Sequence, residues 1–173
     1  IRAIARAVSD MPPRILRKAS PRCHLSGLEP LKYSEDKEFV YVEDCTEDLN
    51  SAKFAMLLSK NKINKALEIV RNQVKNGAQI INIKIENDLL DGEALITQIL
   101  NLIAAEPGIS RLPVMLNSSN FSIIQAGLKC LQGKGIVNSI NLNKSKENFI
   151  ANATEVFRFG AAIVVVPYDE DGL

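Results

Sequence analysis

The sequence predicts an α/β protein built on a parallel sheet, and two observations support this fold class. First, short apolar segments alternate with longer segments whose apolar residues fall on one helical face, which is the arrangement of repeated strand–helix units. Second, the short segments are almost continuously apolar, which indicates strands that are buried on both faces. The five predicted strands span residues 39–42, 79–85, 112–116, 135–140 and 161–166.

Helical segments are predicted between these strands. Ser51 can cap a helix that begins at Ala52. A second helix in the same interval ends at Gly77, a residue type that is common just after a helix. Pro107-Gly108 closes the helix that follows the second strand. The helical stretches predicted after the first are 66–74, 95–103, 121–131 and 146–159.

The amino-terminal part of the chain lacks the alternation of strands and helices. An apolar stripe at helical spacing is formed by Ile1, Ile4, Ala5 and Val8. Pro12 and Pro13 end this helix. From there to residue 37 no period is sustained, so we expect an extended linker. The sequence therefore divides into residues 1–37, a helix plus linker, and residues 38–173, the strand–helix repeats.

The repeats leave two architectures open, a doubly wound sheet and a (β/α)₈ barrel, and periodicity does not distinguish them. A complete barrel needs about 250 residues, whereas this chain of 173 residues has five predicted strands. If the fold is a barrel, we therefore expect it to be a partial one.

Composition argues against several classes of function. The 21 basic and 20 acidic residues give a net charge of +1, and only 5% of residues are aromatic, which is unlike a nucleic-acid-binding protein. No apolar run approaches the roughly 20 residues that cross a bilayer, so we expect no membrane partner. The three cysteines, beside one histidine, show no recognisable zinc-binding spacing. These features favour a cytoplasmic protein.

Polar residues end every predicted strand, and in either architecture ligands bind at the carboxyl ends of the strands. Amides are frequent among these residues. An amide offers both a donor and an acceptor, which suits a flat heterocycle with N–H and C=O edges. The alternative is that these loops are polar only because they meet solvent and cap helices. The polar segments are 43–45, Asn82 with Lys84, 117–119, 138–139 and 168–170.

Six strings of this chain are distinctive enough to compare with known families. They are residues 25–31 (LSGLEPL), 77–81 (GAQII), 101–107 (NLIAAEP), 126–134 (AGLKCLQGK), 136–140 (IVNSI) and 168–172 (YDEDG). Together they resemble the folate domain of the cobalamin-dependent methionine synthase family. Residues 1–8 resemble the last helix of the homocysteine-binding barrel that precedes that domain in the family.

The resemblance implies a partial (β/α)₈ TIM barrel of the pterin-binding type, with about five strand–helix units in residues 38–173. It implies methyltransferase activity, in which 5-methyltetrahydrofolate is presented to cob(I)alamin and homocysteine later receives the methyl group as methionine. Cobalamin and zinc are expected only on other domains, the cobalamin-binding and homocysteine-binding domains in cis. Residues 1–37 would hold the terminal helix of the homocysteine-binding domain and the linker.

By the same resemblance, five residues correspond to pterin-binding positions: Glu47, Asn82, Lys84, Asn117 and Asn138. In the family, carboxylates and amides at these positions bind the N–H and amino groups of the pterin. Asn138 keeps the family's residue. Asn82 and Asn117 stand where the family has Asp, and Lys84 stands where it has Asn. The first-strand motif around Glu47 lacks its Arg and Asn.

These changes predict a weakened folate site. A hydrogen bond to a charged group contributes about 1.5–3 kcal/mol. Loss of two carboxylates and gain of a lysine therefore predict a cost on the order of 4 kcal/mol, or about a thousandfold in affinity. Two functions stay open: the folate module of a methyltransferase whose other parts lie outside this chain, and a truncated or degenerate relic without catalysis. We expect this segment alone to be inactive.

Overall fold

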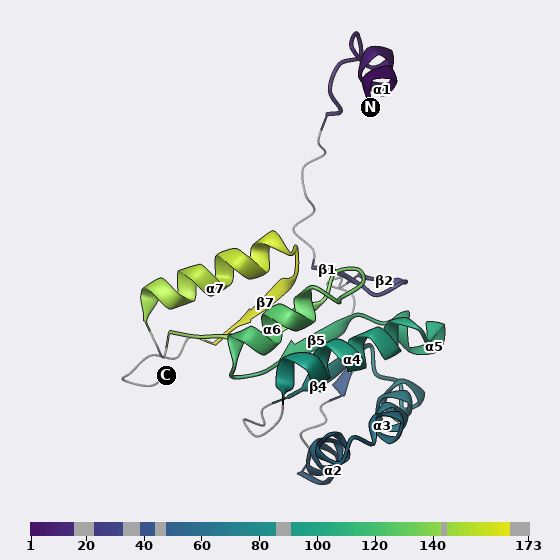
Figure 1. The fold of residues 1–173 in the computed structure, drawn as a ribbon, viewed down its shortest axis with the longest axis vertical. Coiled ribbons are helices and arrows are strands. Elements are labelled where there is room, and N and C mark those ends of the chain that lie inside the picture. Colours follow the sequence, from purple (N-terminus) through teal and green to yellow (C-terminus); the bar gives the residue numbers. More distant parts are fainter. Residues whose placement is uncertain (16–22, 33–38, 44–47, 86–90, 143–144, 167–173) are drawn as a thin grey trace.

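A computed structural model describes residues 1–15, 23–32, 39–43, 48–85, 91–142 and 145–166 of the chain (Figure 1). Its centre is a five-stranded parallel sheet, as the sequence predicted. The strands are β3 (Val42–Glu43), β4 (Ile80–Lys84), β5 (Val114–Asn117), β6 (Ile136–Ile140) and β7 (Ala162–Val165). Each lies within or beside one of the five predicted apolar segments.

The order of the strands separates the two architectures that periodicity left open. Each strand pairs in parallel with the next one in the chain, giving the order β3-β4-β5-β6-β7. A doubly wound sheet reverses its strand order at a switch point, whereas a (β/α)₈ barrel adds strands sequentially. The fold is therefore a partial TIM barrel of about five strand–helix units.

Six helices follow or connect these strands in the described part of the chain. They are α2 (Asp48–Ser59), α3 (Ile63–Lys75), α4 (Gly92–Ala104), α5 (Pro107–Ser110), α6 (Phe121–Leu128) and α7 (Lys146–Arg158). Three have side-chain caps: Asp91, Asn120 and Ser145 accept hydrogen bonds from backbone N–H groups of α4, α6 and α7. Gly77, at a φ of 94°, follows α3 as predicted.

Three predicted helix boundaries were wrong. α2 begins at Asp48 rather than Ala52, so Ser51 lies inside the helix rather than before its first residue. Pro107, predicted to close a helix, instead begins α5, where a first-turn proline loses no hydrogen bond. α6 ends at Leu128, three residues before the predicted end at Leu131.

The strands are covered on one face by the helices. Ile81, Ile83 and Val137 are completely buried and belong to a large cluster with the apolar sides of α2 to α7. The alternate strand residues face the other way, into the interior of the partial barrel, because side chains alternate along a strand. Ile80, Met115 and Ile136 form this inner apolar layer with Leu25.

A β-hairpin lies inside the segment predicted as an extended linker. β1 (His24–Ser26) and β2 (Pro30–Lys32) pair antiparallel, and Leu25 is buried against the inner apolar layer. Ser26 and Lys134 exchange backbone hydrogen bonds of 3.0 and 2.9 Å, and the N–H of Leu28 donates to Ser110 at 2.9 Å. Since Ser110 and Lys134 precede β5 and β6, the hairpin closes the amino end of the sheet (Figure 1).

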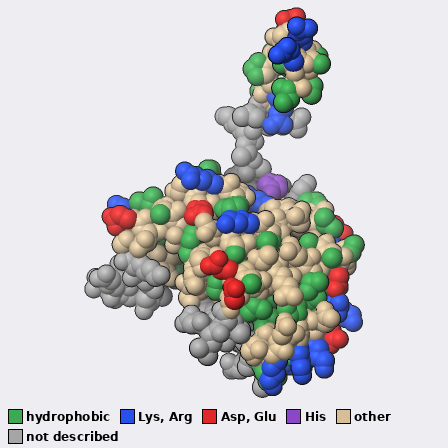
Figure 2. Space-filling view, viewed as in Figure 1, with side chains coloured by type: hydrophobic (Ala, Val, Ile, Leu, Met, Phe, Trp, Pro, Cys, Tyr) green, Lys and Arg blue, Asp and Glu red, His purple; other side chains and the backbone are tan. Residues whose placement is uncertain are grey.

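The amino-terminal helix α1 (Arg2–Ala7) forms where the apolar stripe predicted it. All of its residues are exposed, and it stands apart from the sheet (Figure 1). On the face drawn in Figure 2, basic and acidic side chains are interspersed with apolar ones, and several basic side chains gather near the lower end, over α2 and α3. None of the described helices has the length and apolar character needed to cross a membrane.

Candidate functional site

A row of polar side chains crosses three neighbouring strands at their carboxyl ends. Lys84 on β4 pairs in register with Asn117 on β5, and Asn117 pairs with Asn138 on β6. Residues paired in register lie on the same face of a sheet, about 4.8 Å apart from strand to strand. Side chains alternate along a strand, so residues an even number of positions apart face the same way. Lys84 lies four positions after Ile80, and Asn117 and Asn138 lie two positions after Met115 and Ile136, which belong to the inner apolar layer. The row therefore faces the barrel interior.

Asn82 lies one step below this row, on the same face of β4 as Lys84. It pairs in register with Met115 and is only 2% exposed. Lys84, Asn117 and Asn138 are half-buried. We call Asn82, Lys84, Asn117 and Asn138 the polar rim. The structure thus brings together four of the five predicted site residues, whereas Glu47 lies outside the described residues.

The loop that follows β5 is held in place by its own serine. The hydroxyl of Ser118 donates to the carbonyl of Ile85 at 2.7 Å and accepts from the N–H of Asn120 at 3.2 Å. Asn120 in turn caps α6 through a 3.1 Å hydrogen bond from Ser122. Ser118 is buried. The Asn-Ser-Ser string after β5 therefore has two roles, because Asn117 faces the interior while Ser118 fixes the loop.

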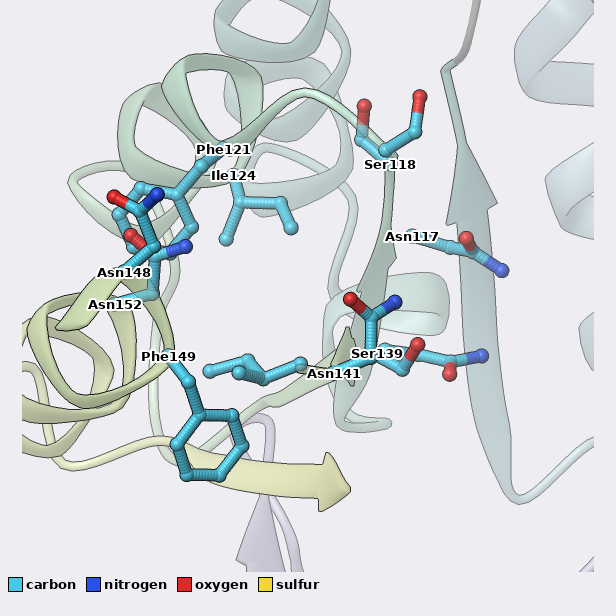
Figure 3. A pocket seen from close by; sticks show the side chains of 12 residues that line it. Asn117, Ser118, Phe121, Ile124, Ser139, Asn141, Asn148, Phe149 and Asn152 are labelled. Carbon is cyan, nitrogen blue, oxygen red and sulfur yellow. The ribbon is translucent and has the colours of Figure 1, made fainter. Parts of the chain in front are cut away.

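A groove of about 310 Å³ opens at the carboxyl ends of β5 and β6, and Asn117 and Asn138 of the polar rim are among the residues that line it. Its walls come from α6, α7 and the ends of β5 and β6. Figure 3 shows Phe121 and Ile124 of α6 together with Asn148 and Asn152 of α7, while Asn117 directs its amide away from them. None of the residues that line the groove is charged.

Sequence reasoning missed the α7 contribution to this groove. Asn148 and Asn152 lie four residues apart, a spacing that places two side chains on the same face of a helix. The spacing is visible in the sequence, but no local pattern shows that this face of α7 lies opposite α6. Phe149 of the same helix also lines the groove and packs against the core.

The described residues contain no cluster of three or more His, Cys, Asp or Glu side chains that could hold a metal ion. The functional features of this end of the sheet are therefore amides, hydroxyls, aromatic rings and one lysine. Such groups bind and orient an organic ligand by hydrogen bonding and stacking.

A partial (β/α)₈ barrel with a polar rim at the carboxyl ends of its strands defines a class of ligand-binding α/β proteins. Comparison with known families narrows that class. The pterin-binding enzyme family matches this chain over residues 47–171. The chain belongs to that family. The matched range contains the whole polar rim and leaves out the hairpin and α1.

Proposed function

We propose that this chain is the methyltetrahydrofolate-binding part of a protein of the cobalamin-dependent methionine synthase type. The observation that carries the proposal is the register of Lys84, Asn117 and Asn138, which sets three polar side chains side by side above buried Asn82. The pterin-binding family also includes dihydropteroate synthase, so the methyltransferase assignment rests on the six strings that resemble methionine synthases.

In this proposal, the polar rim binds the pterin ring of 5-methyltetrahydrofolate. The amides of Asn117 and Asn138 donate to and accept from the edge of the ring, and Asn82 forms the floor beneath it. Cobalamin, bound by another domain, would supply the cobalt that accepts the methyl group. The residues of this chain hold and orient the folate, and they exclude water from the buried side of the ring.

The second candidate is a non-catalytic relic of the same domain, and the identity of the rim residues favours it. An amide at position 82 or 117 directs an NH₂ group toward a ligand edge that is itself rich in donors. Lys84 adds a cation to the same row. Both changes weaken binding of a donor-rich heterocycle while leaving the apolar packing of the strands intact.

Titration of the 173-residue chain with 5-methyltetrahydrofolate tests the proposal. We expect no saturation of the unaltered chain at micromolar ligand. The triple variant Asn82→Asp, Lys84→Asn, Asn117→Asp should gain at least tenfold in affinity, because it restores two charged acceptors and removes the cation. Lys84→Asn alone should gain less, since it removes the cation but restores neither of the two charged acceptors.

Asn101→Asp provides a control for a single Asn→Asp replacement, because this exposed asparagine near the end of α4 is not part of the rim and the change adds one negative charge. It should leave binding unchanged. A micromolar dissociation constant for the unaltered chain would exclude the damaged-site candidate. If the triple variant folds and binds no better than the control, the polar rim is not a pterin site and the proposal fails.

A further inference from the structure

We infer that the end of the sheet formed by α7 and β7 binds a second copy of this chain across a twofold axis. Figure 1 shows α7 and β7 together at one end of the sheet. In the part of the chain that the structure describes, β7 pairs with β6 alone. The inference goes beyond the proposed function, because no residue of the polar rim belongs to α7 or β7.

The outer edge of β7 is suited to pairing with another strand. The N–H groups of Ala162 and Val166 donate to backbone carbonyls on the β6 side, at 2.9 and 3.1 Å. Since these groups alternate along a strand, those of Ile163 and Val165 point to the outer edge. Residues 161–166 include no charged residue and no proline, which are common means of blocking an edge strand. The opposite edge strand, β3, has only two residues, so β7 is the better edge for pairing.

α7 directs an apolar side over this same edge. Phe149 and Val156 pack on the core, and Glu155 is hydrogen-bonded to α6. A helix turns by about 100° per residue, so Ile150 and Phe157, which follow the two core residues, lie on the side turned away from α6. They are 51% and 79% exposed. Strand and helix therefore leave apolar surface uncovered at one end of the molecule.

A second copy that pairs with β7 would also bring its own α7 to packing distance. α7 contacts both β6 and β7, so it lies over the space between them. Neighbouring strands are about 4.8 Å apart. In an antiparallel pair of β7 strands, the two α7 helices therefore lie on the same face of the joined sheet, about 10 Å apart. Helices pack at about 8–10 Å.

One twofold axis serves both contacts. The midpoint of Ile150 and Phe157 lies about 10 Å before Gly160, at about 1.5 Å per helical residue. Val164, the centre of the outer edge, lies about 13 Å after Gly160, at about 3.3 Å per strand residue. Because α7 and β7 run in opposite directions from the turn at Gly160, the two centres lie at nearly the same height.

The charges of α7 match this arrangement. The axis places Ile150 opposite Phe157 of the second copy, and like flanks of the two helices meet. Glu147 and Arg158 lie on the same flank of that apolar side, by the turn per residue of the helix. Glu147 comes within about two residues, or about 3 Å along the axis, of Arg158 of the second copy. Two Glu–Arg pairs therefore form across the axis.

Sedimentation equilibrium of the 173-residue chain tests the inference. The contact is small, so we expect a reversible dimer whose population rises between about 1 and 100 μM chain. Phe157→Glu should weaken dimerisation at least about tenfold, because it places two carboxylates in the apolar centre of the interface. Met56→Glu is the matched control, since it replaces an exposed apolar residue of α2 at the other end of the sheet and should leave dimerisation unchanged.

Exchange of charges separates a twofold contact from a role of α7 within one chain. Glu147→Arg and Arg158→Glu should each weaken dimerisation by about fivefold. The double variant should recover the affinity of the unaltered chain, because the pairs form again with exchanged signs. The two residues lie about 16 Å apart along α7, so this recovery does not arise within one copy.

Circular dichroism confirms that each variant folds. A chain that stays monomeric up to about 100 μM overturns the inference and leaves the face to a different occupant. Growth of large aggregates without a dimer also overturns it, because a twofold contact closes on itself. So does a double charge variant that fails to recover, or a Phe157→Glu chain that dimerises like the control. None of these results bears on the polar rim, so the proposed function is decided separately by the folate titration.

Discussion

The two ends of the sheet carry opposite chemistry on the same interior face. At the amino ends of the strands this face presents the inner apolar layer, Ile80, Met115 and Ile136. Two residues further along each strand it presents Asn82, Asn117 and Asn138. Along each strand, the interior face therefore changes from packed core to polar rim within two residues, which is one repeat of the side-chain alternation.

This contrast separates stability from binding. The amino end is closed by the hairpin, with Leu25 buried on the inner apolar layer and backbone hydrogen bonds to the segments before β5 and β6. The carboxyl end keeps half-buried polar groups beside a groove. Changes at the amino end should therefore alter the free energy of unfolding and leave ligand binding intact. Changes at the polar rim should alter ligand binding and should change the free energy of unfolding by a smaller amount than changes at the amino end.

Gly27→Ala is expected to have the largest effect on stability. A Cβ at this position would lie 2.3 Å from the carbonyl oxygens of both Leu112 and Ser110, which are backbone atoms fixed by the start of β5. The hairpin would have to move, at a cost of about 2–3 kcal/mol. Thermal unfolding followed by circular dichroism should show a melting temperature lower by several degrees.

Gly108→Ala is the control for this prediction. Apart from its chain neighbours and the backbone of its own helix, no atom lies within 4 Å of a Cβ built at Gly108 in α5, so alanine should leave stability unchanged or raise it slightly. If Gly27→Ala and Gly108→Ala have the same melting temperature, the hairpin does not close the amino end as the structure indicates.

The sheet could be predicted from the sequence because its signals are local. Each strand is a short apolar run, and each helix has its own apolar stripe, so alternation was visible without any long-range information. The polar rim followed from the rule that ligands bind at the carboxyl ends of parallel strands. The order of the strands did not follow, since neighbouring strands are chosen by contacts between distant residues.

The hairpin and the groove were missed for the same physical reason. β1 and β2 have three residues each, too few to show a period, and their partners Ser110 and Lys134 are distant in sequence. The groove joins α6 and α7, whose facing residues no local pattern connects. Features that depend on packing between elements become visible only when the elements are assembled.

Asn82→Asp tests the boundary between the two ends and should have an intermediate effect. Asn82 is 2% exposed, so a carboxylate there would be largely desolvated. At pH 7 we expect a loss of about 1–2 kcal/mol in the free energy of unfolding, measured with urea. Burial raises the pKa of the new carboxyl, so the loss should shrink as the pH falls and the neutral form takes over.

Lys84 lies two residues away on the same face of β4, and its charge should offset part of this loss. The loss of unfolding free energy caused by Asn82→Asp should therefore be larger in a chain that already carries Lys84→Asn than in the unaltered chain. A double-mutant cycle measures the difference. Equal losses in the two backgrounds would show that position 82 does not sense the rim lysine.

Glu106→Gln should have the smallest effect, because it removes a surface ion pair at the closed end. Arg71 of α3 donates to Glu106 through Nε at 2.9 Å and Nη2 at 2.5 Å, and both side chains remain partly exposed. The hydrogen bond from Arg71 lowers the pKa of the Glu106 carboxyl, outweighing the burial that would raise it. Exposed pairs contribute little, so the melting temperature at pH 7 should fall by at most a few degrees.

The sign of the pH dependence follows from the lowered pKa. A carboxyl whose pKa is lower in the folded chain stabilises the fold above its unfolded pKa of about 4.3, and that stabilisation is lost as the pH falls through the folded value. The difference between the unaltered chain and Glu106→Gln should therefore be present at pH 7 and disappear in strong acid. High salt at pH 7 should also reduce it. A difference that persists in acid would mean that Glu106 stabilises the amino end through packing rather than charge, as Leu25 does.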